Sequence, residues 1–254
     1  MQNQRPKMIN WCTAALMTAA GAAHADVLYD ALYTNAHNDS TSDFISSSIG
    51  GLNLWGGNYD LQSADDFTLA TDTAMTAITY DTFGFATTAN GSVPSAVRVE
   101  FFQDVAGAPA AAASHSVTVN TFSSVQVLGS VGSNFNGGDS GSEPILRLGI
   151  DLSGESVVLG AGTWWVSMSA ESGDNWYYNF GAWSGTFQGN RPQRRDGGLA
   201  HGNGYTGIWG SYNWAALGSG TADIAMRLEG VAVPAPATFA MLGLGALGAA
   251  RRRR

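Results

Sequence analysis

The sequence is poor in cysteine and in charge. Cys12 is the only cysteine among 254 residues, and charged residues make up 13% of the chain, about half the usual share for a globular protein. A single cysteine excludes a framework of intramolecular disulfides. All 20 acidic residues stand between Asp26 and Glu229 together with only six basic ones, a net charge of −14 for that segment. Such a segment would repel phosphates, so we expect no nucleic-acid partner.

Residues 1–25 are typical of a secretory signal peptide. Arg5 and Lys7 form a cationic start, and an uncharged apolar stretch follows. Ala23 and Ala25 are the small residues that signal peptidase accepts before its cleavage site. Asp26 is therefore the expected first residue of the exported protein, with signal peptidase as a partner. A buried N-terminal helix is the alternative interpretation.

An uncharged stretch of 21 residues, Gly230 to Ala250, precedes a run of four arginines. Pro234 and Pro236 keep a helix from beginning much before residue 236. A helix over Ala237 to Ala250 would be about 21 Å long, against a membrane hydrocarbon core of about 30 Å. The arginines would stay on the cytoplasmic side. We predict a short membrane helix that holds the protein transiently at the inner membrane; a permanent tail anchor is the alternative.

The same segment resembles the sorting signal of PEP-CTERM proteins, an element also labelled after the C-terminus of ice-binding proteins. The resemblance is carried by Val233, Pro234 and Pro236, by the glycine-, leucine- and alanine-rich stretch, and by Arg251, Arg252, Arg253 and Arg254. Ala235 stands where the family has glutamate. The resemblance implies a Gram-negative source, recognition by an exosortase, which is a membrane cysteine protease-transpeptidase, and delivery to the outer surface or the extracellular space.

Strand patterns recur through the middle of the chain. Apolar and polar residues alternate over 97–101, 146–150 and 224–228, and β-rich stretches occupy 66–69, 75–85, 115–122, 124–128 and 163–169. No segment shows a sustained helical period. We predict an all-β fold, an antiparallel β-sandwich of jelly-roll type over residues 26–230, flanked by an N-terminal signal helix and, within 231–254, a short C-terminal membrane helix.

This middle part is also similar to a sandwich domain common in exported bacterial proteins. The similarity lies in Asp65-Asp66-Phe67-Thr68-Leu69, Val99-Glu100-Phe101-Phe102, the Gly107 to Pro109 turn, Gly160 to Ser167 and Ala222 to Gly230. That family is mostly without assigned activity. The resemblance therefore implies a fold and an extracellular setting, and it transfers no catalytic residue.

Aromatic residues gather late in the chain, with 12 of the 27 between Trp164 and Trp214. Trp176, Tyr178, Trp183 and Trp209 stand among glycine and polar residues, where exposed rings could stack on sugar faces. The alternative is that these rings cover an edge of the sandwich. The neighbouring Arg191, Arg194 and Arg195 could pair with Asp196 or an acidic polysaccharide; we interpret them as a solvated loop.

The remaining candidate chemistry is sparse. Asp65 and Asp66 precede a strand pattern and could offer oxygen ligands to Ca²⁺, although a turn in which their side chains bond backbone N–H groups explains them as well. No metal, cofactor or enzymatic activity is expected, because neither carboxylates nor histidines form a recognisable catalytic arrangement. The function we expect is a structural or adhesive one within a polysaccharide matrix; the alternative is a lectin-like module that recognises an exopolysaccharide.

Overall fold

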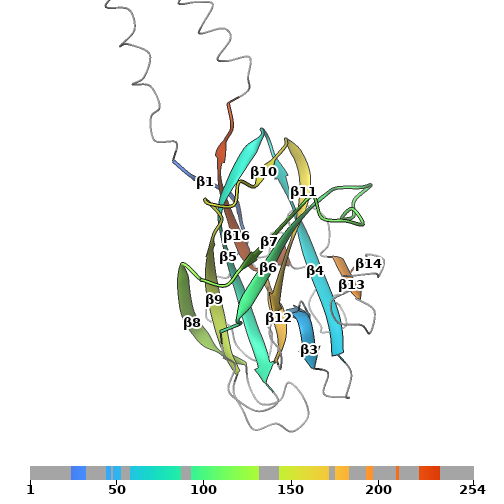
Figure 1. Cartoon of the computed structure of the whole chain (residues 1–254), viewed down its shortest axis with the longest axis vertical. Coiled ribbons are helices and arrows are strands. Elements are labelled where there is room, and N and C mark those ends of the chain that lie inside the picture. The colour runs from blue at the N-terminus through green and yellow to red at the C-terminus, as the bar shows by residue number, and fades with distance from the viewer. Residues whose placement is uncertain are drawn as a thin grey trace, which may run out of the picture.

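The computed structural model describes residues 24–32, 44–46, 48–52, 58–86, 93–131, 143–171, 175–182, 193–196, 210–211 and 223–234. Every regular element in these ranges is a strand (Figure 1). None of them contains a helix long and apolar enough to cross a membrane. The predicted signal helix and membrane helix fall outside the described residues.

The strands form two sheets, and we call the part of the chain that builds them, Asp26 to Ala232, the body. The first sheet contains β1 (Asp26–Asp30), β2 (Phe44–Ser46), β5 (Thr73–Ala86), β8 (Ser124–Val131), β9 (Glu143–Asp151), β10 (Val158–Leu159), β12 (Asn175–Ala182), β15 (Asp223–Ile224) and β16 (Met226–Ala232). The second sheet contains β3 (Ser48–Leu52), β4 (Asn58–Leu69), β6 (Ala96–Gln103), β7 (His115–Val119), β11 (Gly162–Glu171), β13 (Gln193–Asp196) and β14 (Gly210–Ser211). All described pairings are antiparallel except that of β11 with β3.

The long strand β5 organises the first sheet. One of its edges pairs with β10 and then β9, and the other pairs with β16 and then β12. Its sequence suits this position because β-branched and aromatic residues favour strands. Met75, Ile78 and Tyr80 of β5 are buried, so its inner face belongs to the core.

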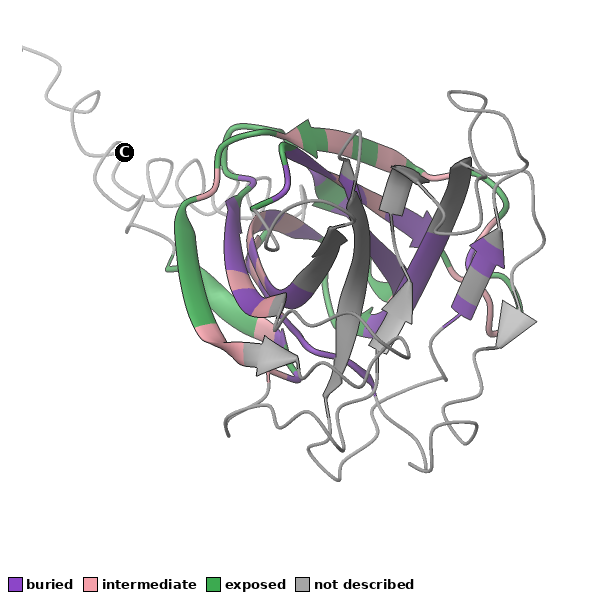
Figure 2. Cartoon of the chain, turned by 90° about the horizontal axis from the view of Figure 1, so that it is seen from below, coloured by how far each residue is buried: buried purple, intermediate pink, exposed green. Residues whose placement is uncertain are grey.

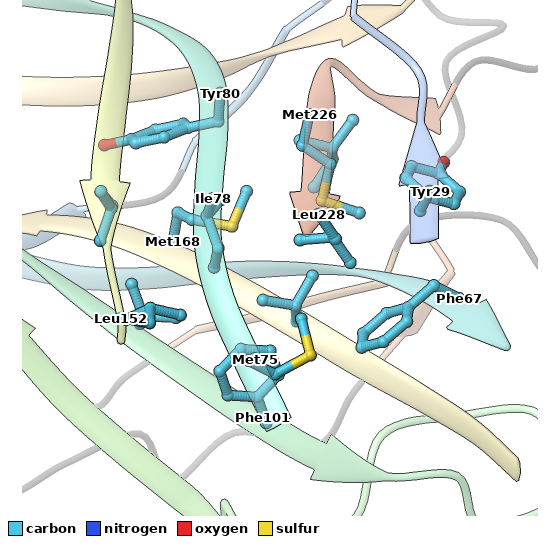
Figure 3. Packing of buried hydrophobic residues seen from close by; sticks show 14 of the residues in the cluster. Tyr29, Phe67, Met75, Ile78, Tyr80, Phe101, Leu152, Met168, Met226 and Leu228 are labelled. Atoms are coloured by element: carbon cyan, nitrogen blue, oxygen red, sulfur yellow. The ribbon is translucent and has the colours of Figure 1, made fainter. Parts of the chain in front are cut away.

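One hydrophobic core joins the two sheets. Side chains from β5 and β16 meet Phe67, Phe101 and Met168 of the second sheet (Figure 3). Phe67 and Phe101 pack edge to face, with ring centroids 6.4 Å apart, a favoured geometry for aromatic pairs. The buried positions gather on the inner side of the curved sheets (Figure 2). The predicted all-β fold with antiparallel sheets is thus confirmed, whereas the jelly-roll connectivity stays a prediction.

The outer face of the second sheet is also covered. Trp165 of β11 is fully buried beside Phe102 and Ala64, outside the main core, and Ala113 packs against this group. The indole Nε1–H of Trp165 donates to Asp104 Oδ1 at 2.8 Å. Its neighbour Trp164 points the opposite way and is buried in the main core. Trp165 is buried on the outer face because the segment after β6 folds back over it.

The interpretation of Arg195 as part of a solvated loop was wrong. Arg195 lies in β13 and is only 6% exposed. Its Nε donates to Gln62 Oε1 at 2.7 Å, one of its terminal nitrogens donates to the Ala111 carbonyl oxygen at 2.7 Å, and its guanidinium stands 5.3 Å from the centre of the Phe102 ring. These contacts replace the water that the charge would otherwise keep.

Candidate functional site

The predicted sorting segment adjoins the end of β16. This strand lies between β1 and β5, with Gly230 opposite Asp26 and Ala232 opposite Thr73. The beginning of β1 and the end of β16 consequently lie at the same end of the body (Figure 1). The predicted signal peptide and the predicted sorting segment therefore both adjoin the body at this one end.

The chain is fixed to the body one residue beyond the strand. The backbone N–H of Val233 donates to the carbonyl oxygen of Asp72 at 2.8 Å. Asp72 lies in the turn between β4 and β5, and its Oδ1 accepts a hydrogen bond from the N–H of Ala161 at 3.0 Å. The Thr73 hydroxyl donates to the carbonyl oxygen of Thr71 at 2.9 Å. Sequence reasoning missed Asp72, which stands in the sequence as an ordinary turn residue between two strand patterns.

Gly230 permits the close approach of three strands near this end. A Cβ atom at Gly230 would stand 2.7 Å from Thr73 Cγ2 and 2.8 Å from both the Ala74 carbonyl oxygen and Leu28 Cδ1. The register between β16 and β5 also shifts between Glu229 and Gly230, which marks a β-bulge. A side chain at this position would push β16 away from β1 or from β5.

We expect Gly230→Ala to lower the free energy of unfolding by about 1–3 kcal/mol, the usual cost of overpacking. The matched control is Gly154→Ala, because a Cβ atom at Gly154 would meet nothing within 4 Å. This control should change stability by less than about 0.5 kcal/mol. Urea unfolding of both purified variants measures the difference, and equal stabilities would contradict the tight packing at Gly230.

Three buried carboxyl groups gather where β4 meets β15. Asp65, Asp66 and Asp223 are at most 2% exposed. Asp65 Oδ2 accepts from the N–H of Ile224 at 2.6 Å, and its Oδ1 accepts from the N–H of Asp66 at 3.0 Å. Burial raises the pKa of Asp65 well above its ordinary value, and the charge of Asp223 raises it further. Asp65 thus joins a strand of one sheet to a strand of the other.

Asp65 and Asp66 were placed before a strand by the sequence analysis and lie inside β4 instead. Hydrogen bonds to backbone N–H groups make a buried carboxyl group tolerable within a strand. Within the described ranges, no three side chains of the types His, Cys, Asp and Glu are placed to hold a metal ion together.

Asp65 should make stability fall as pH rises. Its raised pKa means that the folded protein holds a proton there after the unfolded chain has lost it, so unfolding becomes easier from about pH 4 up to the folded-state pKa. We expect the stability difference between Asp65→Asn and the unchanged protein to grow in favour of the variant across this window. Urea unfolding at several pH values measures it.

Asp151→Asn is the control of opposite sign. Hydrogen bonds from the side chain and the backbone N–H of Ser153 lower the pKa of Asp151. Its stabilising effect is therefore present at neutral pH and is lost as pH falls toward the folded-state pKa. The same pH trend for both variants would argue against a protonated Asp65 in the fold.

The other predicted site residues are spread over the chain. Trp176 and Tyr178 lie in β12, paired with Phe85 and Phe83 of β5, and only their backbone is described. Ala25, Asp26, Val233 and Pro234 are exposed residues at the shared end of the body. Ala23, Trp183, Trp209, Pro236, Arg251, Arg252, Arg253 and Arg254 lie outside the described residues.

A hollow of about 360 Å³ opens between the β7–β8 connection and the segment after β9. Its lining includes Thr118, Asn120, Thr121, Phe122, Asp151 and Glu155. These residues combine a ring with hydroxyl, amide and carboxylate groups, which is the chemistry that binds hydroxyl-rich ligands. No pattern in the sequence indicated this hollow.

Comparison with known proteins identifies the segment that begins in β16. Residues 232–254 match the family model described as the PEP-CTERM protein-sorting motif. No curated protein and no solved structure matches the chain. The motif implies export and sorting by an exosortase, with transient anchoring in the membrane. The chain is therefore one that carries a PEP-CTERM protein-sorting motif, joined directly to an all-β body.

Proposed function

We propose that this protein is an exported, non-enzymatic component of the cell surface or extracellular matrix with a structural or adhesive role. The observation that carries the proposal is the match of residues 232–254 to the sorting motif, which begins at the final residue of the last strand of the body. In this proposal signal peptidase cleaves before Asp26, and an exosortase cleaves near Pro234. The acidic, low-charge composition of the body suits contact with a hydrated polysaccharide matrix rather than with nucleic acid.

Intact mass of the protein from membrane and extracellular fractions tests this proposal. Cells with and without an exosortase are compared. We expect a membrane-bound form ending at Arg254 in cells without the enzyme, and a form that begins at Asp26 and ends near Pro234 outside cells that have it. A form ending at Arg254 in both kinds of cell would overturn the proposed processing.

A lectin-like role is the second candidate, and the hollow beside Phe122 favours it. Asn120 and Thr121 are exposed at its rim, and Phe122 is half-buried. The aromatic residues proposed from the sequence, Trp176 and Tyr178 among them, are a separate candidate for glycan binding.

Tryptophan fluorescence and a glycan panel separate the two roles. A lectin should lose binding in Asn120→Ala or in Trp176→Ala, depending on which surface binds. Val127→Ala, at a 64% exposed position on β8, is the matched control that should bind normally. If no glycan binds the unchanged protein, the lectin role is excluded and the structural role remains.

A further inference from the structure

The end of β16 belongs to the sheet and to the sorting motif at once. Ala232 is the last residue of β16 and the first residue that matches the motif. Val231 pairs with Ala74, and Ala232 pairs with Thr73. The hydrogen bond from Val233 to Asp72 continues this pairing into the motif. The segment Val231–Val233 is thus held by its backbone.

The turn that holds this segment is itself fixed. The Asp72 carboxylate is bonded to Ala161, which precedes β11 of the second sheet. Val233 therefore cannot leave Asp72 by movement of the turn alone. Its release requires separation of β16 from β5.

Backbone pairing, rather than burial, is what keeps an enzyme from this segment. Val233 is 38% exposed, and Ala232 and Pro234 are exposed as well. Enzymes that bind an extended peptide form hydrogen bonds with its backbone, as a strand added to a sheet does. A backbone N–H that already donates within the sheet cannot donate to an enzyme at the same time.

We propose that Val231–Val233 leave β5 before processing and become the segment that the exosortase binds on the N-terminal side of the motif. The inference rests on the proposed function, since it concerns the same cleavage. The folded body then sets the rate at which the precursor is processed, because only the opened end of β16 is a substrate.

The arrangement of β16 makes local opening feasible. Its register with β1 ends at the pair Asp26 and Gly230, so in the described residues Val231 and Ala232 pair along the β5 edge only. Strand ends of this kind open at much lower free energy than the core. When opening and closing are faster than cleavage, the cleavage rate follows the population of the open form.

A disulfide between β5 and the end of β16 tests the proposal. The hydrogen bond of Val233 to Asp72 makes Ala74 and Val231 a hydrogen-bonded pair, with Cα atoms about 5.5 Å apart, a distance that a disulfide spans. The full chain with Ala74→Cys and Val231→Cys is produced in cells that contain an exosortase, and loss of the precursor is followed by intact mass. We expect the oxidised form to stay unprocessed and the reduced form to be processed at the normal rate.

The matched control links the same two strands deeper in the sheet. Thr79 and Arg227 are also paired, four residues further from the motif. With Thr79→Cys and Arg227→Cys oxidised, Val231–Val233 can still open, so processing should continue at the normal rate. Processing of the oxidised 74/231 form at the normal rate would overturn the proposal, and so would equal loss in both disulfide forms.

A flexible insertion provides the rescue. Gly-Ser-Gly-Ser between Val233 and Pro234 would offer unpaired residues to the enzyme without any opening of the sheet. We expect this insertion to restore processing in the oxidised 74/231 form and to speed it severalfold in the otherwise unchanged chain. If neither the unchanged chain nor the insertion variant is processed, the proposed function fails; if disulfide and insertion both leave the rate unchanged, only this inference fails.

Discussion

Replacing Arg147 by methionine should lower the free energy of unfolding by about 3 kcal/mol, because removal of one partner leaves a buried charge behind. Asp81 of β5 is fully buried, and it accepts hydrogen bonds from Arg147 Nε at 2.6 Å and from a terminal nitrogen at 2.8 Å. The hydrogen bond to Asp81 raises the pKa of Arg147, so its guanidinium remains charged. Urea unfolding at neutral pH measures the loss.

Arg227→Met is the matched control for this prediction. Arg227 also donates two hydrogen bonds to a carboxylate, that of Asp30, but both side chains are about 40% exposed. Its loss should cost less than about 1 kcal/mol. The double variant Asp81→Asn with Arg147→Met should recover part of the stability, since the buried charge is then absent. Similar losses for the two arginines would show that burial of Asp81 does not determine the effect.

Trp165→Ala should cost about 3–5 kcal/mol, the range for deletion of a fully buried aromatic side chain. Trp165 is fully buried beside Phe102 and Ala64, and it bonds Asp104. The substitution opens a cavity on the outer face of the second sheet, in the group of side chains against which Ala113 of the covering segment packs. Thermal or urea unfolding, with near-UV circular dichroism as a readout of aromatic packing, measures the effect.

Two further variants separate packing from hydrogen bonding at Trp165. Trp165→Phe keeps much of the ring and removes the donor to Asp104, so it should lose less stability than Trp165→Ala. Val127→Ala, at an exposed position on β8, should change stability by less than about 0.5 kcal/mol. A loss below about 1 kcal/mol in Trp165→Ala would mean that the outer face is solvated rather than covered.

Local patterns in the sequence predicted the strands because half-buried strands alternate in polarity. The alternation at 97–101 and 146–150 corresponds to β6 and β9. The pattern at 224–228 was also correct in kind, although Ala225 separates β15 from β16. Period-2 alternation reports which face of a strand is apolar, and this is a property of the strand alone.

The sequence did not reveal what covers the outer faces or where charges are buried. Arg195 was interpreted as part of a solvated loop, and Asp65 as a calcium ligand or a turn residue, because charged side chains are almost never buried without partners. Their partners, Gln62 and Ile224, are 133 and 159 residues away in the chain. Contacts at such separations follow from the pairing of whole strands, which no local pattern encodes.

The hydrogen bond that ties Val233 to Asp72 was beyond prediction for the same reason. The motif itself could be identified, since it is a contiguous segment with a fixed order of prolines, apolar residues and arginines. Its attachment to the sheet depends on the register of β16 against β5. The sorting motif could therefore be identified from the sequence, whereas its accessibility to an enzyme could not be predicted.

The pairing of β1 with β16 fixes the order of events during synthesis. β1 is the first strand of the body, and among the described residues its partner is β16, the last one. Because a chain is synthesised from its N-terminus, β1 cannot meet this partner until nearly all of the body has been made. This edge of the sheet then closes only when the sorting motif itself is arriving at the membrane. Folding of the body is therefore completed at nearly the same time as the sorting motif reaches the membrane. A chain truncated before β16 would leave both β1 and one edge of β5 without their partner strand.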